Sequence, residues 1–268
     1  MTGTSKNTVA KLLADLGNAC AEYHDKHVRN LLVRRLQADE IWSFVGAKAK
    51  NVSVEQKAAG WGDIWTWVGI CADTKFVVSY MVGGRDTSWA MEFMDDCASR
   101  IASRIQLSTD AHRPYLKAVE GAFGLDVDYA QVHKIFGASD EPDSRYSPAK
   151  CIGCDMKTVI GYPDPAHVST SFVERQNFTL RMSSRRFTRL TNGYSKKVEN
   201  HAHAVAIHYM HYNFVRIHQS LRTTPAMEIG LATTPWMIDD PIALLPKPVV
   251  KTSKNDWKIL KRALGESA

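Results

Sequence analysis

Residues 36–45, which read LQADEIWSFV, constrain the fold more than any other stretch of this chain. The segment is apolar enough to be a buried strand, yet it carries two adjacent carboxylates, Asp39 and Glu40, that a purely structural strand would avoid. Neighbouring side chains on a strand point to opposite faces, so we expect only one of the pair to face a site. We expect that residue to be Asp39, with Glu40 turned away from the site or into solvent.

The length and composition indicate one catalytic domain with short appendages. The chain has 268 residues, of which 44% are hydrophobic, enough to bury a large core. No uncharged apolar run reaches about 18 residues. The first thirty residues lack the pattern of a secretory signal, so a cytoplasmic protein with no membrane partner is expected. Five scattered cysteines favour reduced thiols over a disulfide framework.

The positive charge is concentrated in one C-terminal block. The formal net charge is +6, and residues 175–222 contain nine Lys or Arg against one acid, Glu199. A solvated helical face would normally mix the two signs. The block therefore favours contact with phosphate over an ordinary surface.

Hydrophobic periodicity and turn residues predict an α/β fold with a mixed five-stranded sheet. The strands are expected at residues 36–45, 63–72, 76–82, 105–108 and 126–135. Helices are expected at residues 87–103, from Pro114, from Val168 and at 196–214. The order is βββαβαβ followed by helices, with the first strand central and the fourth beside it.

Three parts of the chain are expected: an N-terminal helical segment (1–35), a catalytic domain (36–231) with an irregular insertion at about 137–165, and a C-terminal tail (232–268). In the first part, Ser5 can cap one helix, and a second helix over about 21–35 is expected to lead into the first strand. Ser5, Lys6 and Asn7 lie where the recognition helix of a helix-turn-helix carries its base contacts. The segment is then either a partial helix-turn-helix or an ordinary amphipathic helix.

Three acids fall where this fold would bring them together. Asp39 is on the first strand, Asp110 at the end of the fourth, and Glu174 on the helix after the fifth. Carboxylates with no Cys or His ligand beside them favour Mg²⁺ or Mn²⁺. Two such ions about 4 Å apart can support displacement at phosphorus.

These residues resemble the ribonuclease H-like core of DDE transposases and integrases. The intervals are 71 residues (110 − 39) and 64 residues (174 − 110), and Arg181 follows Glu174 by seven positions, where many of these enzymes have a base. The segment HYNFVRIHQSLRTTPA (211–226) resembles the signature after their last catalytic helix. DEIWSFV, LSTDAHRPYL and STSFVERQNFTLRMSSRRFTRLTN resemble bacterial insertion-sequence transposases of the insertion sequence one family. The resemblance covers about residues 5–231.

The resemblance implies a DNA transposase that cleaves element ends and transfers the freed 3′-hydroxyl into target DNA. Asp39, Asp110 and Glu174 would be catalytic and would hold two Mg²⁺ or Mn²⁺ ions. The partners would be double-stranded DNA, as terminal inverted repeats and as target, and further copies of the chain in a homo-oligomer. The residues expected to contact DNA are Arg181, Arg185, Arg186, Arg189, Lys196, Lys197, Arg216 and His218, with Ser5, Lys6 and Asn7 in the first helix.

The chain departs from this family in two ways. The N-terminal DNA-binding region is expected to be cut short, and the interval from Asp110 to Glu174 exceeds that of the compact members.

Two other functions stay open. A nuclease of the same fold would use the acids for hydrolysis only, and a truncated transposase would bind DNA or regulate transposition without catalysis. Cys151 and Cys154 form a single C-x₂-C pair, which needs two more ligands to bind zinc, so that site is left unassigned.

Overall fold

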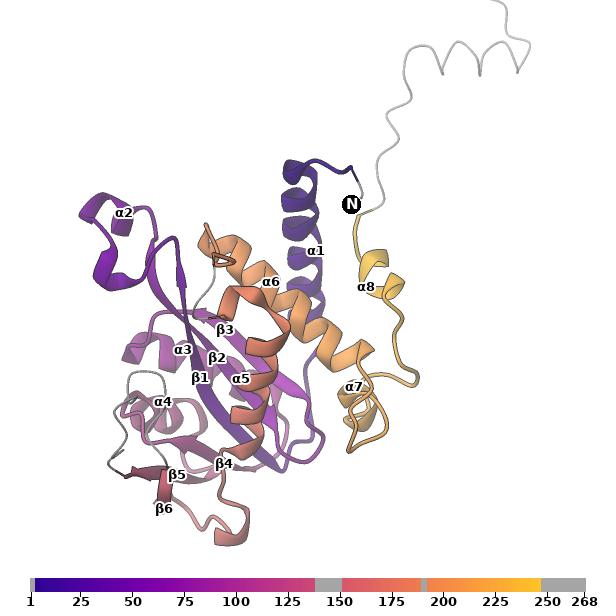
Figure 1. The fold of residues 1–268 in the computed structure, drawn as a ribbon. Helices are drawn as coiled ribbons and strands as arrows, with labels where there is room; N and C mark the ends of the chain where they lie inside the picture. The colour runs from indigo at the N-terminus through magenta and orange to yellow at the C-terminus, as the bar shows by residue number, and fades with distance from the viewer. Residues whose placement is uncertain (1–2, 138–150, 189–191, 247–268) are drawn as a thin grey trace, which may run out of the picture.

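The computed structural model describes residues 3–137, 151–188 and 192–246. A mixed six-stranded sheet lies at the centre of these residues, with helices on both faces (Figure 1). The strands are β1 (Arg35–Val45), β2 (Gly62–Cys71), β3 (Val77–Gly83), β4 (Ile105–Asp110), β5 (Val127–Phe136) and β6 (Cys151–Ile160). The helices are α1 (Lys6–His27), α2 (Val54–Ala58), α3 (Thr87–Arg100), α4 (Pro114–Phe123), α5 (Ser171–Ser183), α6 (Val198–Met210), α7 (Pro225–Glu228) and α8 (Asp239–Ala243). Shorter turns lie at Ala49–Asn51, Pro165–His167 and Arg185–Phe187, and a π-helical turn extends α6 over His211–Val215.

The strand order across the sheet is β3-β2-β1-β4-β5-β6. β1 is antiparallel to β2 and parallel to β4, and β4 is parallel to β5. The prediction that the first strand is central, with the fourth beside it, is confirmed. A mixed sheet of this order with flanking helices is compatible with a ribonuclease H-like fold.

The prediction of five strands is wrong, because β6 adds an edge strand antiparallel to β5. It lies inside the segment that was expected to be irregular, of which residues 138–150 are outside the described part. Both faces of β6 are largely exposed, so its side chains do not alternate between buried and exposed. Sequence patterning has no signal for a strand that is held by backbone pairing alone.

The two faces of the sheet bury separate clusters of side chains. On one face, the Trp67 ring contacts Phe93 of α3 and Tyr115 of α4, with ring centroids 5.7 and 5.5 Å apart. The next residue, Val68, points to the other face and packs in a cluster that includes Val173 of α5. This alternation along β2 fixes α3 and α4 on one side and α5 and α6 on the other.

The N-terminal segment is one helix where two were expected. α1 runs unbroken for 22 residues, and a single buried stripe, Gly17, Cys20 and His24, continues across the position of the expected break. The predicted cap is present, because the Ser5 hydroxyl accepts a hydrogen bond from the Thr8 amide at 3.2 Å. α1 therefore packs as one amphipathic helix.

Gly17 allows α1 to lie unusually close to α6. A Cβ atom at this position would lie 2.3 Å from the Cβ of His203, far inside van der Waals contact. Beside it, a side-chain hydrogen bond of 2.9 Å joins His203 Nε2 and Asn18 Oδ1.

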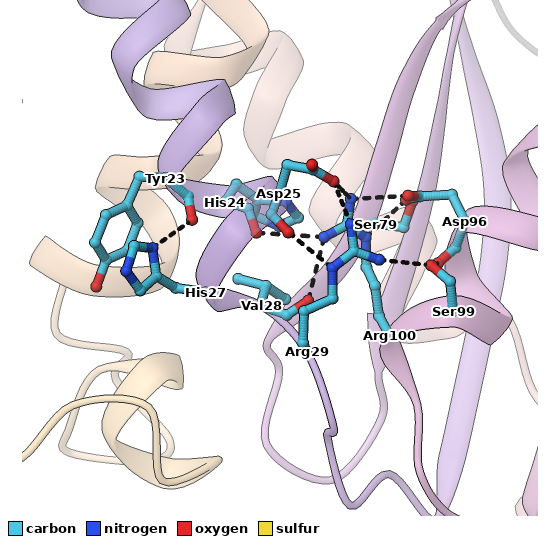
Figure 2. Close-up of polar contacts among 10 residues, drawn as sticks. All are labelled: Tyr23, His24, Asp25, His27, Val28, Arg29, Ser79, Asp96, Ser99 and Arg100. Carbon is cyan, nitrogen blue, oxygen red and sulfur yellow. Dashed lines mark hydrogen bonds and ion pairs between the residues drawn. The ribbon is translucent and has the colours of Figure 1, made fainter.

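A buried guanidinium fixes the C-terminal end of α1 to the core (Figure 2). Arg100, at the end of α3, is 5% exposed and donates to Asp96 Oδ1 at 2.8 Å and to Asp25 Oδ1 at 3.1 Å. It also donates to the backbone carbonyls of His24 and Val28, at 3.3 and 3.2 Å. One side chain thus joins the last turn of α1 to α3 and satisfies the carbonyl of the C-cap residue Val28, which lies beyond the last helical hydrogen bond.

Among the described residues, no helix combines the length and the apolar character needed to span a bilayer.

Candidate active site

The sheet register places Asp39 next to Asp110. In the parallel pair of β1 and β4, Ala38 lies opposite Thr109, and the pairing ends there. The next residue on each strand is the acid, so both carboxylates stand where the two strands part, the position at which α/β folds bind ligands. Carboxylate oxygens of Asp39, Glu40 and Asp110 all lie within 4.8 Å of one another. The predicted convergence of Asp39 and Asp110 is therefore present.

The expectation that Glu40 faces away from the site is wrong. Glu40 is 7% exposed and belongs to the acidic cluster. Its Oε1 is 2.6 Å from Arg85 Nη2, and its Oε2 accepts a hydrogen bond from the Tyr115 hydroxyl at 3.0 Å. Side chains alternate along β1, so Glu40 starts from the face opposite Asp39. The pairing of β1 with β4 ends at Ala38, and beyond this point the long Glu40 side chain can reach past the open edge of β1 to the two aspartates.

Glu174 lies in the same pocket but outside the tight cluster. It sits in the first turn of α5, where its Oε2 is 2.6 Å from Lys134 Nζ of β5, and it accepts a hydrogen bond from the Thr170 hydroxyl. Glu174, Asp39 and Glu40 all line a pocket of about 350 Å³, which we call the acidic pocket. The structure therefore brings Asp39 and Asp110 together with Glu40 and places Glu174 on the wall beside them.

The acidic cluster carries an electrostatic conflict. Burial, followed by repulsion from Glu40 and Asp110, raises the pKa of Asp39 to about 7, and Glu174 adds to the effect. Burial and Asp110 also raise the pKa of Glu40, although Arg85 opposes the shift. Buried like charges are relieved by a shared cation. The oxygen-only donor set fits Mg²⁺ or Mn²⁺.

One stripe of α5 forms a wall of the acidic pocket. Glu174, Asn177, Phe178 and Arg181 recur at helical spacing and all line the pocket. Asn177 donates from Nδ2 to Asp39 Oδ2 at 2.9 Å. Sequence analysis missed Asn177, although its position three residues after Glu174 could have indicated it. Arg181, seven positions after Glu174, lies in the same pocket.

The other cations expected to contact DNA lie in different environments. Arg185, Lys196 and Lys197 are exposed. Arg186 is half-buried and donates to the Ser195 hydroxyl at 2.9 Å, so part of its role is to hold the chain between α5 and α6.

The remaining candidates lie in three further places. Arg216 and His218 line a separate pocket. Lys6 and Asn7 are exposed in the first turn of α1. Arg189 lies outside the described residues.

The cysteine pair does not gather a metal-binding set in the described part of the chain. Cys151 and Cys154 are exposed on β6 with their sulfurs 4.0 Å apart. Among the described residues, the acidic cluster at Asp39 is the one group of three or more potential ligands close enough to share an ion. The described residues therefore give no support to zinc at this pair.

Comparison with known proteins gives no family assignment from sequence. No family model matches the chain, and no curated protein matches it. Among solved structures, the chain is similar to one in a simian T-cell lymphotropic virus intasome in complex with PP2A regulatory subunit B56 gamma. The TM-score is 0.42 at 16% identity, covering 84% of this chain and 62% of that one. It is also similar to one in a piggyBac transposase synaptic complex with hairpin DNA, with a TM-score of 0.31 at 12% identity, covering 86% of this chain and 62% of that one. This chain thus spans less than two thirds of either matched chain.

Proposed function

We propose that this protein is a DNA transposase of a bacterial insertion sequence, which cleaves DNA at the element ends and transfers the freed 3′-hydroxyl to target DNA. The observation that carries the proposal is the convergence of Asp39, Glu40 and Asp110 within 4.8 Å, where two parallel strands part. Buried carboxylates that repel one another are suited to a divalent cation. Such sites catalyse displacement at phosphorus.

The ligands that we propose are Asp39, Asp110 and Glu174. Glu174 lies on the wall of the pocket and would join the site by exchanging its partner Lys134 for a cation. When bound, two Mg²⁺ or Mn²⁺ ions would polarise the scissile phosphate and stabilise charge on the attacking and leaving oxygens.

Other residues of the pocket would orient the acids and the DNA. The amide of Asn177 holds one oxygen of Asp39 and so limits the rotation of this carboxylate. Arg181 lines the same pocket, and its planar guanidinium can grip a phosphate with two parallel hydrogen bonds. The ion pair with Arg85 opposes the rise that burial and Asp110 cause in the pKa of Glu40 and holds this side chain next to the proposed ligands.

The proposed partners are two double-stranded DNAs, the terminal inverted repeats and the target. The exposed cations Arg185, Lys196 and Lys197 would contact the backbone, as would Arg216 and His218, and such contacts supply affinity with little sequence reading. Ser5, Lys6 and Asn7 would add contacts from the start of α1. On this proposal the protein works in the cytoplasm as a homo-oligomer assembled on DNA.

The test is cleavage of a duplex that carries the inverted repeats flanking the coding region. Asp39→Asn, Asp110→Asn and Glu174→Gln should each lower the Mg²⁺-dependent cleavage rate by at least about a thousandfold, because each removes a charged ligand. Binding of the same duplex, measured by fluorescence anisotropy, should change less than about threefold because these acids do not attract DNA. Glu120→Gln, an exposed acid on α4, is the matched control and should cleave normally. Cleavage retained by any of the three variants would contradict the proposal.

A second assay separates transfer from hydrolysis. Duplexes with pre-cut ends and a free 3′-hydroxyl should become joined to target plasmid by the wild-type protein. Cleavage without joined product would indicate a nuclease of the same fold. Binding without either product would indicate a regulator.

A further inference from the structure

Helix α5 carries a second stripe of side chains that faces a second pocket. Phe172, Arg175, Gln176 and Thr179 follow the same helical spacing as the stripe in the acidic pocket, displaced around the helix, and they line a pocket of about 220 Å³. One helix therefore forms a wall of both pockets.

The second pocket is cationic. Lys75 from the turn before β3, Arg175 from α5, and Arg216 and His218 from the segment after the π-helical turn all line it. The described residues that line it include no Asp or Glu. These groups also act on one another, since burial lowers the pKa of His218 and Lys75 and Arg216 lower it further. An anion in the pocket would relieve this repulsion.

A buried amide in the same pocket lacks a hydrogen-bond partner. Gln176 is 2% exposed, and its side-chain nitrogen Nε2 has no acceptor within the described residues. An unsatisfied buried donor destabilises a fold, so such groups usually have a functional reason to persist. An oxyanion in the pocket could accept this hydrogen bond.

We propose that this pocket binds a backbone phosphate of the DNA substrate and so sets which phosphodiester reaches the acidic cluster. The inference rests on the proposed function, because it takes DNA as the source of the anion. Phosphate suits the pocket because Arg175 and Arg216 can each donate two hydrogen bonds to its oxygens, while Lys75 adds a compact charge. Because both pockets share α5, a phosphate held in one would lie at a fixed offset from the acids in the other.

The decisive variant is Gln176→Met, which keeps the length of the side chain and removes its amide. It should weaken binding of a duplex by about tenfold, the effect expected for a hydrogen bond to a charged group. The melting temperature of the free protein should stay unchanged or rise, because the unsatisfied donor is gone. A residue with a purely structural role would not weaken binding while leaving the fold at least as stable.

The variant Arg175→Ala tests whether the positive charge of this pocket contributes to DNA binding. The slope of log affinity against log salt concentration should become shallower by about 1, as expected when one phosphate contact is lost. Arg175→Lys should recover part of the slope, because the charge returns without the planar fork. Arg34→Ala, an exposed arginine in the connection between α1 and β1, is the matched control and should leave the slope unchanged.

Three outcomes would overturn the inference. The first is a DNA affinity of Gln176→Met that matches that of the Arg34→Ala control, and the second is a salt slope of Arg175→Ala that matches that of the same control. The third is that inorganic phosphate raises the melting temperature of the wild type but not of Gln176→Met, while the two proteins bind DNA equally well. This result would assign the pocket to a free anion. If the wild-type protein cleaves and joins DNA while both pocket variants bind normally, only this inference fails. If the wild-type protein binds no DNA, the proposed function fails with it.

Discussion

Asp39 carries a charge conflict that protein groups do not fully resolve. Its carboxylate accepts a hydrogen bond from Asn177, yet burial and three neighbouring acids still raise its pKa and favour its protonated form. A residue chosen for fold stability alone would not be an acid at this place. A bound cation would relieve the repulsion among these acids. The free energy of unfolding of the metal-free protein should therefore depend on the charge of Asp39.

We expect the metal-free protein to lose stability as the pH rises through 7. The pKa of Asp39 is raised from 3.8 to about 7 in the folded state, so the folded chain binds more protons than the unfolded chain between these values. The stabilisation is full below about pH 3.8 and is lost above pH 7. Between pH 5 and pH 8 the wild type should lose on the order of 2 kcal/mol through this group, after allowance for partial contact with water.

The measurement is urea unfolding at both pH values with a metal chelator present. Asp39→Asn removes the titrating group and should flatten the pH dependence. Addition of Mg²⁺ at pH 8 should stabilise the wild type and have little effect on this variant. An equally steep pH dependence in Asp39→Asn would show that Asp39 is not the source.

Glu40 and Glu174 compete for the role of third ligand, and their surroundings differ. Glu40 is occupied by Arg85 and Tyr115, whereas Glu174 has the single exchangeable cation Lys134. We expect Glu40→Gln to keep cleavage within about tenfold of wild type, because a glutamine oxygen can still accept the hydrogen bond from Tyr115. Glu174→Gln should abolish cleavage. Cleavage rates that rank in the opposite order would identify the compact cluster as the complete ligand set.

At the scale of elements, α1 is attached to the core at both ends of its buried stripe. The close approach at Gly17 fixes it to α6, and the Arg100 network fixes its last turn to α3 (Figure 2). An N-terminal helix held in this way moves with the core.

Arg100→Met should destabilise the protein by about 3–5 kcal/mol, because it removes the cation paired with the half-buried Asp96 and the donor to the Val28 carbonyl at the C-cap of α1. Arg29→Met is the matched control. It removes a more exposed arginine that pairs with Asp25 and should cost no more than about 1 kcal/mol. Urea unfolding measures both changes, and limited proteolysis should cut α1 first in Arg100→Met. Equal losses in the two variants would show that the buried network is no more important than a surface pair.

Elements could be predicted where one face is buried. β1 to β5, α3 and α4 were found because buried side chains recur with period 2 or 3.6. β6 was missed because neither of its faces is buried. The expected division of the N-terminal segment into two helices was wrong because α1 continues through Gly17, which allows close packing against α6.

At the scale of the whole molecule, chain order predicted which acids lie near one another, but not how they are held. The proximity of Asp39 to Asp110 followed from the central position of β1 in the sheet. The contacts of Glu40 with Arg85 and of Glu174 with Lys134 are tertiary contacts between separate elements, and no periodicity within one segment encodes them. The second pocket was hidden for the same reason, since Lys75 and Arg175 come from distant parts of the sequence.

The parallel register of β1 with β4 has a consequence for the time at which the chain can act. Ala38 and Thr109 become neighbours only after some seventy intervening residues have been synthesised, and α5 emerges later still. A half-made chain on the ribosome thus has no assembled acidic pocket, and under the proposed function it could not cleave DNA until α5 had emerged.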